Sequence, residues 1–152
     1  MGTNTPITDA SLRAFVGYDM KRAFNALQAD LTRSLAPFDL RMMTFSALSL
    51  VVENPGLRPS QLAQVLTIER ANLVVIVDEL EQRGLLTRTP SATDRRAHEL
   101  RVTDHGDQLY KRARDAVAAH DKRMIAGLKN PVQSQLKDAL RHIEKNAKQV
   151  EP

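Results

Sequence analysis

The residues best suited to chemistry in this sequence lie between positions 69 and 75, where hydrogen-bonding side chains stand beside small apolar ones. Arg70 and Asn72 each carry a planar group with paired hydrogen-bonding atoms. An arginine can donate to O6 and N7 of guanine, and an asparagine can bind N6 and N7 of adenine. A small apolar side chain such as Ala71 can meet the methyl group of thymine. The segment therefore indicates recognition of base edges in the major groove of DNA.

Three neighbouring residues leave two interpretations open. Glu69 can be a favourable charge at a helix start or an acceptor for N4 of cytosine. Val74 and Val75 can contact bases, or they can pack against the neighbouring helix or the strands that follow. We count all three among the predicted DNA contacts.

A second charged group falls at the tip of a predicted turn, at Asp94, Arg95 and Arg96. Asp94 can pair with one arginine and stiffen the tip. The other arginine is then free to enter a narrow minor groove, where the electrostatic potential is most negative. A charge run on a loop can also be simply solvated.

A third group lies at the start of a short helix that Pro59 opens. Ser60 and Gln61 present a hydroxyl, an amide and free backbone N–H groups on which a DNA phosphate could dock. Ser60 would serve equally well as the N-cap of that helix. Arg88, in the strand that follows the second helix, completes the predicted DNA contacts.

The sequence gives little support for a catalytic, cofactor-binding or metal-binding site. The sequence has no cysteine, which excludes disulfides, thiolate catalysis, thiol redox sensing and cysteine-ligated metals. The four histidines show no metal-like spacing with carboxylates, and no catalytic triad order, phosphate-binding glycine loop or paired-carboxylate site stands out. We therefore expect no enzyme, no resident cofactor and no metal.

Length and composition set the class of protein. At 152 residues the chain is long enough for one domain with a core. No basic flank precedes an unbroken apolar run, so we expect neither a secretion signal nor a membrane segment, and a cytoplasmic location. The net charge of +4 permits a polyanionic partner but is too small to prove one.

The DNA-contacting candidates need elements that hold them on one surface. The predicted elements are helices over 60–66 and 69–83 and strands over 85–88 and 99–102. Gly84 stops the second helix, whose buried stripe consists of Leu73, Ile76, Val77 and Leu80. The pattern predicts a winged helix-turn-helix domain over 38–103.

Longer helices flank this domain. The predicted helices run from Thr8 to about Leu35, from an Asp39 cap to about Val51, from Thr103 to about Leu128, and from Pro131 to about Ala147. The first and last carry apolar stripes that a small winged helix cannot bury, including Leu12, Phe15, Val16, Leu136, Leu140 and Ile143. These stripes need each other or a second chain to cover them. We assign 8–36 and 104–150 as dimerisation helices, in a fold that is mainly α with a small β-wing.

At this point the sequence resembles the MarR family of bacterial winged-helix transcription regulators. The resemblance spans nearly the whole chain and is strongest in 80–88 and in Asp94-x-Arg96 followed by Val102, Thr103 and Gly106. The family pattern has leucine where this chain has Val102, which is a mild departure.

The resemblance implies an obligate homodimer whose terminal helices interlock and whose two winged-helix lobes read a palindromic operator. It also implies that Arg95 enters the minor groove and that Asp94 with Arg96 braces the wing. Many members carry threonine and arginine where this chain has Val74 and Val75. That difference shifts the predicted base reading toward Arg70, Ala71 and Asn72.

A narrower resemblance concerns the signal that the protein senses. Arg70-Ala71-Asn72-Leu73 and the segment 17–23 are similar to regulators of aromatic-acid or hydroxycinnamate breakdown, which answer to the acid or its coenzyme A thioester. The predicted effector site lies between the first, second and fifth helices and is lined by Tyr18, Arg22, Met43 and Phe45. Core packing is the other interpretation of Met43 and Phe45.

The sequence therefore predicts a ligand-responsive repressor that binds operator DNA as a homodimer. The alternative is a winged-helix module that binds another protein and not DNA. Such a module would tolerate the loss of Arg70 and Arg95 together, whereas a DNA-binding repressor would not.

Overall fold

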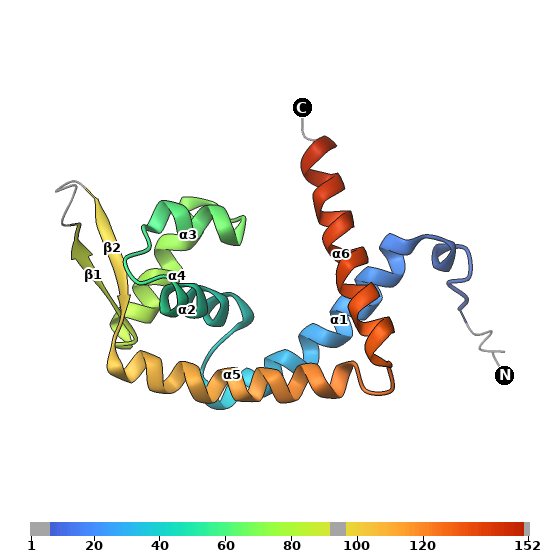
Figure 1. Ribbon diagram of the computed structural model, residues 1–152, viewed down its shortest axis with the longest axis horizontal. Coiled ribbons are helices and arrows are strands. Elements are labelled where there is room, and N and C mark those ends of the chain that lie inside the picture. The colour runs from blue at the N-terminus through green and yellow to red at the C-terminus, as the bar shows by residue number, and fades with distance from the viewer. Residues whose placement is uncertain (1–6, 92–96, 151–152) are drawn as a thin grey trace, which may run out of the picture. The chain divides into compact units, whose positions relative to one another are not determined.

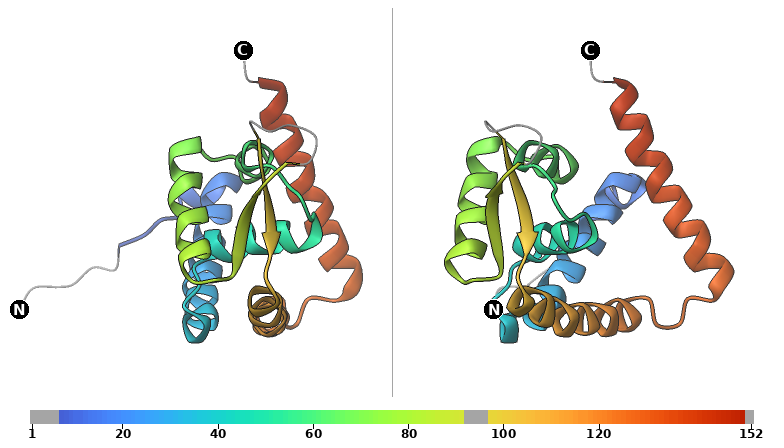
Figure 2. Two further views of the ribbon diagram at one scale, coloured as in Figure 1. Left: turned by 90° about the vertical axis from the view of Figure 1, so that its left-hand side faces the viewer. Right: turned by 60° about the vertical axis from the view of Figure 1, so that its left-hand side comes forward.

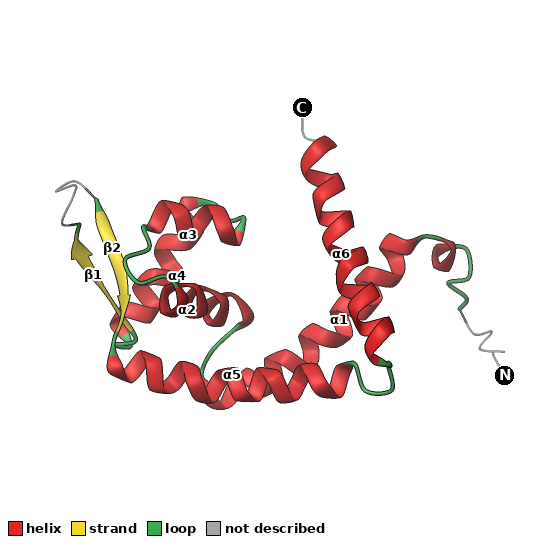
Figure 3. Ribbon diagram, in the orientation of Figure 1, coloured by secondary structure: helices red, strands yellow, loops and turns green. Residues whose placement is uncertain are grey.

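The computed structural model describes residues 7–91 and 97–150, with side chains to 148. The chain divides into two compact units, residues 1–117 and 118–152, and each is described by itself. In chain order the elements are η1 (Leu12–Ala14), α1 (Val16–Leu35), η2 (Ala36–Phe38), α2 (Met42–Glu53), α3 (Pro59–Leu66), α4 (Arg70–Gln82), β1 (Leu86–Pro90), β2 (His98–Val102), α5 (Asp104–Met124) and α6 (Asn130–Val150) (Figures 1 and 3). The predicted class, mainly α with a small β-wing, is confirmed.

Helices α3 and α4 form the predicted helix-turn-helix. The side-chain oxygen of Gln61 accepts a hydrogen bond from the backbone N–H of Arg58 at 3.0 Å, at the start of α3. Thr67 has a left-handed backbone (φ 53°) and turns the chain toward α4. The N-cap expected of Ser60 is wrong, because Pro59 occupies the first helical position and places Ser60 second.

The buried stripe predicted for α4 is confirmed. Its members are at most 7% exposed, and they are Leu73, Ile76, Val77 and Leu80. Gly84 has a left-handed backbone (φ 64°), and the N–H of Leu85 donates to the carbonyl of Leu80 at 2.9 Å. Leu85 therefore belongs to the turn that ends the helix, and the first strand starts one residue later than predicted.

The hairpin pairs β1 and β2 antiparallel, with Leu86 opposite Val102 and Arg88 opposite Leu100. The N–H of Leu100 also donates to the carbonyl of Leu57, in the loop before α3, at 2.9 Å. Figure 2 shows the two strands as neighbouring ribbons beside the helices of the first unit. The predicted wing strands are confirmed, with ends that differ by one or two residues.

Thr103 and Gly106 join the end of the wing to the start of α5. The hydroxyl of Thr103 donates to the carbonyl of Gly84 at 2.6 Å and accepts the N–H of Gly106 at 3.0 Å. A Cβ on Gly106 would lie 1.9 Å from the carbonyl oxygen of Leu85. Glycine is required at 106 by this close approach of the backbone.

The core of the first unit is built around α2. Ala47, Leu48 and Val51 are fully buried, as expected of a helix that is apolar nearly all round. They share one cluster with the α4 stripe and with residues from α3, the hairpin and α5, namely Leu62, Leu86, Leu100 and Ala113.

The first helix starts later than the predicted start at Thr8. Phe15 has an extended backbone (φ −107°, ψ 123°) that separates η1 from α1. Asp9 accepts hydrogen bonds from Arg13 at 3.0 Å and from the hydroxyl of Tyr18 at 2.8 Å. These side chains fold the segment before α1 back on its first turn, where a continuous helix was expected.

The cap predicted at Asp39 is also wrong. Asp39 has a left-handed backbone (φ 51°), and the hydroxyl of Thr44 instead accepts the N–H of Arg41 at 2.8 Å. The guanidinium of Arg83 donates to the carbonyls of Phe38 and Asp39 at 2.9 and 2.6 Å. The turn before α2 is therefore tied to the residue that follows α4.

Apolar side chains remain uncovered on α1 and α6. The residues at the start and middle of α1, and just before it, are 47–68% exposed, and they are Leu12, Phe15, Val16 and Phe24. Along α6 the corresponding stripe is 39–46% exposed, at Val132, Leu136, Leu140 and Ile143. Each stripe lies along its own helix and is not buried within the unit that contains it.

Within the described residues, no single helix is both long and apolar enough to cross a bilayer. Val16–Phe38 and Met42–Glu53 pass that test only as a pair bent by 66°.

Candidate nucleic-acid interface

The outward face of α4 holds every candidate that the sequence placed there. Glu69, Arg70, Ala71 and Asn72 are exposed, and Val74 and Val75 are 52% and 63% exposed. The two valines are therefore not part of the buried core. Val74 borders a hollow beside Pro59 of α3 and His98 of β2, so base contact and packing against a neighbouring element both stay predictions. Because the opposite face of α4 is saturated with buried side chains, this face is available to a partner.

The carboxylates of the second half of α4 are all paired with cations. Asp78 and Glu81 both contact the guanidinium of Arg88, and Glu79 contacts that of Arg41. Unpaired carboxylates would repel DNA phosphates, so this pairing makes the helix surface more compatible with a polyanion.

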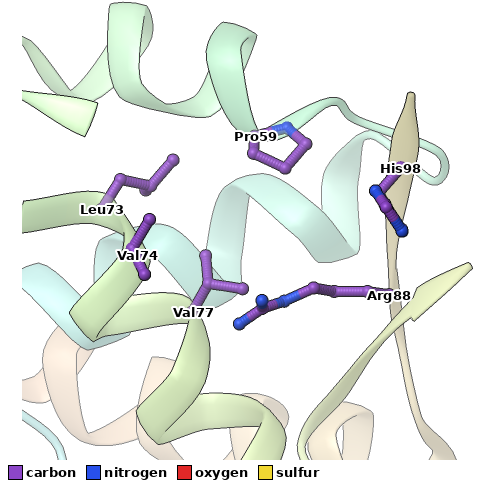
Figure 4. Close-up of a pocket in the computed structure, with 6 residues that line it drawn as sticks. All are labelled: Pro59, Leu73, Val74, Val77, Arg88 and His98. Carbon is purple, nitrogen blue, oxygen red and sulfur yellow. The ribbon is translucent and has the colours of Figure 1, made fainter. Parts of the chain in front are cut away.

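Arg88 crosses from β1 to α4. Its Nε lies 3.2 Å from a carboxylate oxygen of Glu81, its terminal nitrogen donates to Asp78, and its backbone N–H donates to Glu81 at 3.2 Å. Figure 4 shows the side chain reaching toward Val77 between the strand and the helix. In this structure Arg88 holds the wing on α4. The sequence interpretation missed Asp78 and Glu81, although their spacing of three on one helix was a usable signal.

Glu99, on β2, braces the end of the hairpin that leads to the tip. Its carboxylate accepts hydrogen bonds from the hydroxyl of Ser91 at 2.8 Å and from Arg101 at 3.1 Å. The hydrogen bond from Ser91 is the main cause that lowers the pKa of Glu99, with help from Arg101 and Arg58 and against a smaller desolvation. The backbone N–H of Ser91 donates to the carbonyl of Ala97 at 2.9 Å. The wing stem is thus fixed up to its tip.

The tip residues Asp94, Arg95 and Arg96 lie outside the described residues, so their predicted roles stay predictions. Ser60 and Gln61 are exposed in the first turn of α3. Gln61 uses its amide oxygen to cap α3, while Ser60 presents its hydroxyl beside it. No group of three or more histidine, aspartate or glutamate side chains among the described residues could hold a metal ion.

Known proteins resemble this chain both in sequence and in the arrangement of the helix-turn-helix and the wing. Residues 38–97 match the MarR family. The transcriptional repressor CouR bound to a 23-mer DNA duplex is 35% identical, covers 92% of this chain and 99% of its own, and superposes with a TM-score of 0.87. The chain belongs to the MarR family.

Two further relatives fit this MarR-family membership. CouR bound to p-coumaroyl-CoA is 34% identical, with 91% of this chain and 98% of that one covered and a TM-score of 0.82. A putative transcriptional regulatory protein for the hcr operon of Thauera aromatica is 29% identical over 123 residues, which are 80% of this chain and 74% of that protein. The relatives are transcriptional regulators, so the prediction that this MarR-family chain is a regulator and not an enzyme is confirmed.

The four residues predicted to line an effector site in this MarR-family chain have different neighbours. Tyr18 donates its hydroxyl to Asp9, with the guanidinium of Arg13 5.4 Å from its ring centre. The bond to Asp9 raises the pKa of Tyr18 and lowers that of Asp9. Arg22 is exposed on α1. Tyr18 is thus engaged within its own segment.

Phe45 and Met43 lie on α2. The Phe45 ring stacks on Tyr110 of α5, with ring centres 5.9 Å apart and planes inclined by 28°, and the Tyr110 hydroxyl lies 3.0 Å from that of Ser49. Phe45 therefore packs against the core, the other interpretation given for it. Met43 borders a hollow of about 320 Å³ beside α4, which is also lined by Arg41, Ile68, Asn72, Val75 and Ile76. That hollow includes neither Tyr18 nor Arg22.

Proposed function

We propose that this chain is a ligand-responsive repressor that binds a palindromic DNA operator as a homodimer. The observation that carries the proposal is the division of α4 into two faces. Leu73 and Val77 are 2% exposed on one face, whereas Val74 and Val75 are more than half exposed on the other. A helix anchored in this way can enter a major groove without losing its own packing.

The proposed DNA contacts follow from this placement. The base-reading set on α4 is Glu69, Arg70, Ala71, Asn72, Val74 and Val75. Ser60 and Gln61 at the start of α3 contact phosphate, and Arg88 with the wing residues Asp94, Arg95 and Arg96 follows the adjacent groove. CouR, at 35% identity over 92% of this chain, has been solved with a bound 23-mer DNA duplex, which supports DNA binding by a chain of this fold.

The proposed dimer uses the uncovered stripes of α1 and α6. Leu136 and Leu140 on α6 are 44% and 43% exposed, and Phe15 before α1 is 65% exposed. Burial of such side chains against a second copy is favourable by about 25 cal/mol per Å² of apolar surface. A two-fold dimer presents two α4 helices, and we expect half-sites about 34–36 Å apart, one helical turn of DNA.

The proposed effector is a small aromatic acid or its coenzyme A thioester. CouR has been captured with p-coumaroyl-CoA, and the Thauera relative regulates the hcr operon. The effector would bind the DNA-incompetent spacing of the dimer more tightly, because differential affinity is what shifts such an equilibrium. Tyr18, Arg22, Met43 and Phe45 remain the proposed lining residues.

The proposal is tested with duplexes selected from a random library by the full chain. Fluorescence anisotropy should give tight binding whose logarithm falls steeply with the logarithm of salt concentration, because several phosphates per lobe are neutralised. Replacing Arg70 and Arg95 together with alanine should weaken binding by more than about tenfold, since each base contact discriminates by ~1–3 kcal/mol. Addition of p-coumarate or p-coumaroyl-CoA should release the duplex.

Two results separate the alternatives. Unchanged affinity in the Arg70→Ala, Arg95→Ala variant, or failure to select any duplex, would favour a protein-binding module. Tight DNA binding that neither compound releases would leave the repressor in place and remove the aromatic effector.

A further inference from the structure

Three apolar residues occupy the outward face of the first two turns of α4. Ala71, Val74 and Val75 are spaced i, i+3 and i+4, so their side chains are neighbours on the helix surface. All three are exposed, Val74 at 52% and Val75 at 63%. We call Ala71, Val74 and Val75 the methyl triplet.

The methyl triplet does nothing for the fold of the chain. Leu73 and Val77 lie in the same helix and are 2% exposed, so the core is already supplied with apolar groups. Valine is also a poorer helix former than the straight-chain residues common on helix surfaces, because its β-branch restricts χ1. A cluster of exposed apolar groups in a helix without a packing role marks an interaction surface.

The surroundings of the methyl triplet favour DNA over a protein as the occupant. Arg70 and Asn72 flank it with donors that match base edges, and the carboxylates further along α4 are paired with Arg41 and Arg88. Protein interfaces depend on large buried anchors such as tryptophan and tyrosine. The methyl triplet offers only methyl groups, which suit shallow contact on the floor of a major groove.

We infer that Val74 and Val75 contact the 5-methyl groups of thymines in each operator half-site. This inference rests on the proposed DNA-binding function. Thymine is the base that presents a methyl group in the major groove, and apolar side chains contact it there. Because the valine rotamer is already fixed in the helix, little side-chain entropy is lost on binding. A cytosine at the same position would present its N4 amino group to the valines, which have no atom to accept that hydrogen bond.

The test removes single methyl groups from the DNA. Each thymine of a duplex selected by the wild-type chain is replaced in turn by deoxyuridine, which keeps every hydrogen bond and lacks only the methyl. At the thymines that meet Val74 and Val75, we expect affinity to fall about fourfold for each lost contact, and about 16-fold when both half-sites are changed. Protein with Val74→Ala and Val75→Ala should bind thymine and deoxyuridine duplexes equally.

Val65→Ala supplies the matched control. Val65 is an equally exposed valine, at 61%, but it lies on α3. This variant should keep the full sensitivity to deoxyuridine. Melting temperatures of both variants should equal that of the wild type, because none of these side chains is buried.

Each result decides the inference. Tight, salt-dependent binding that is indifferent to deoxyuridine at every position would overturn methyl reading and leave the proposed function standing. Full deoxyuridine sensitivity in the Val74→Ala, Val75→Ala protein would assign the methyl contacts to other residues and also overturn it. If no duplex is selected at all, the inference falls together with the proposed function.

Discussion

The winged helix and the terminal helices differ in how far their apolar side chains are exposed to solvent. In the winged helix Leu48, Leu62 and Leu80 are fully buried within one chain. On α6 Leu136 and Leu140, which are chemically identical, remain more than two-fifths exposed. The winged helix therefore buries its core within a single copy, whereas the apolar stripe of α6 is not buried within its own unit.

Charged residues repeat this contrast. In the winged helix Arg88 and Arg83 join elements that are distant in sequence, by contacts to α4 and to the turn before α2. On α6 the pairs are local, as between Glu144 and Lys148 at 2.8 Å. Exposed local pairs contribute little stability, so the ion pairs of α6 do not anchor it in the way that Arg83 anchors the turn before α2.

The largest effect is expected from a charge placed in the apolar stripe of α6, because this stripe is the proposed dimer interface. Leu136→Glu should weaken dimerisation by more than about 100-fold, because a carboxylate would have to be buried without a partner. Sedimentation equilibrium measures this change. The neighbouring Gln135→Glu adds the same charge outside the stripe and should leave the dimer intact. A dimer that survives Leu136→Glu would show that α6 is not its interface.

A second change compares buried and exposed sites within α4. Leu73→Ala should lower the free energy of unfolding by about 2–5 kcal/mol, because it leaves a cavity beneath the helix. Val75→Ala should change it by less than about 0.5 kcal/mol. Urea denaturation of both variants at one protein concentration provides the measurement. Equal losses would contradict the two-faced description of α4.

The smallest effect is expected at the link between wing and helix. Arg88→Gln removes the cation shared by Asp78 and Glu81, which are partly exposed, so stability should fall by only about 0.5–1 kcal/mol. Amide hydrogen exchange should rise in β1 and β2 and not in α2. Arg33→Gln, which removes an exposed cation that pairs with Asp30 within α1, is the matched control. Unchanged exchange in the strands would argue that Arg88 does not fix the wing.

The sequence predicted the elements better than it predicted their ends. The α4 stripe and the wing were visible because apolar spacing follows helix and strand periods. The caps considered at Asp39 and Ser60 were wrong because Arg41 and Arg58 are the N-caps. The side chains of Thr44 and Gln61, three residues after these N-caps, accept their backbone N–H groups. The choice between neighbouring candidate caps produces no periodic pattern in the sequence, so periodicity cannot predict it.

The candidate site was predictable only where exposure follows from periodicity. The outward position of Val75 follows from the buried stripe that surrounds it in sequence. The pairing of Arg88 with Asp78, and of Tyr18 with Asp9, depends on how separate segments fold onto one another. Spacing in the sequence carries no direct information on such pairs, so the sequence predicted binding roles for Arg88 and Tyr18 but could not predict their neighbours in the structure.

The central claim is that the outward face of α4 contacts DNA, and the absence of native cysteine allows a direct measurement. A single Ala71→Cys substitution places the chain's one thiol on that face, and Asp138→Cys places one on exposed α6 as the control. A selected duplex should slow alkylation at position 71 by more than about tenfold and leave position 138 unchanged, since buried interfaces exclude reagents. Equal alkylation rates at position 71 with and without saturating duplex would contradict the account.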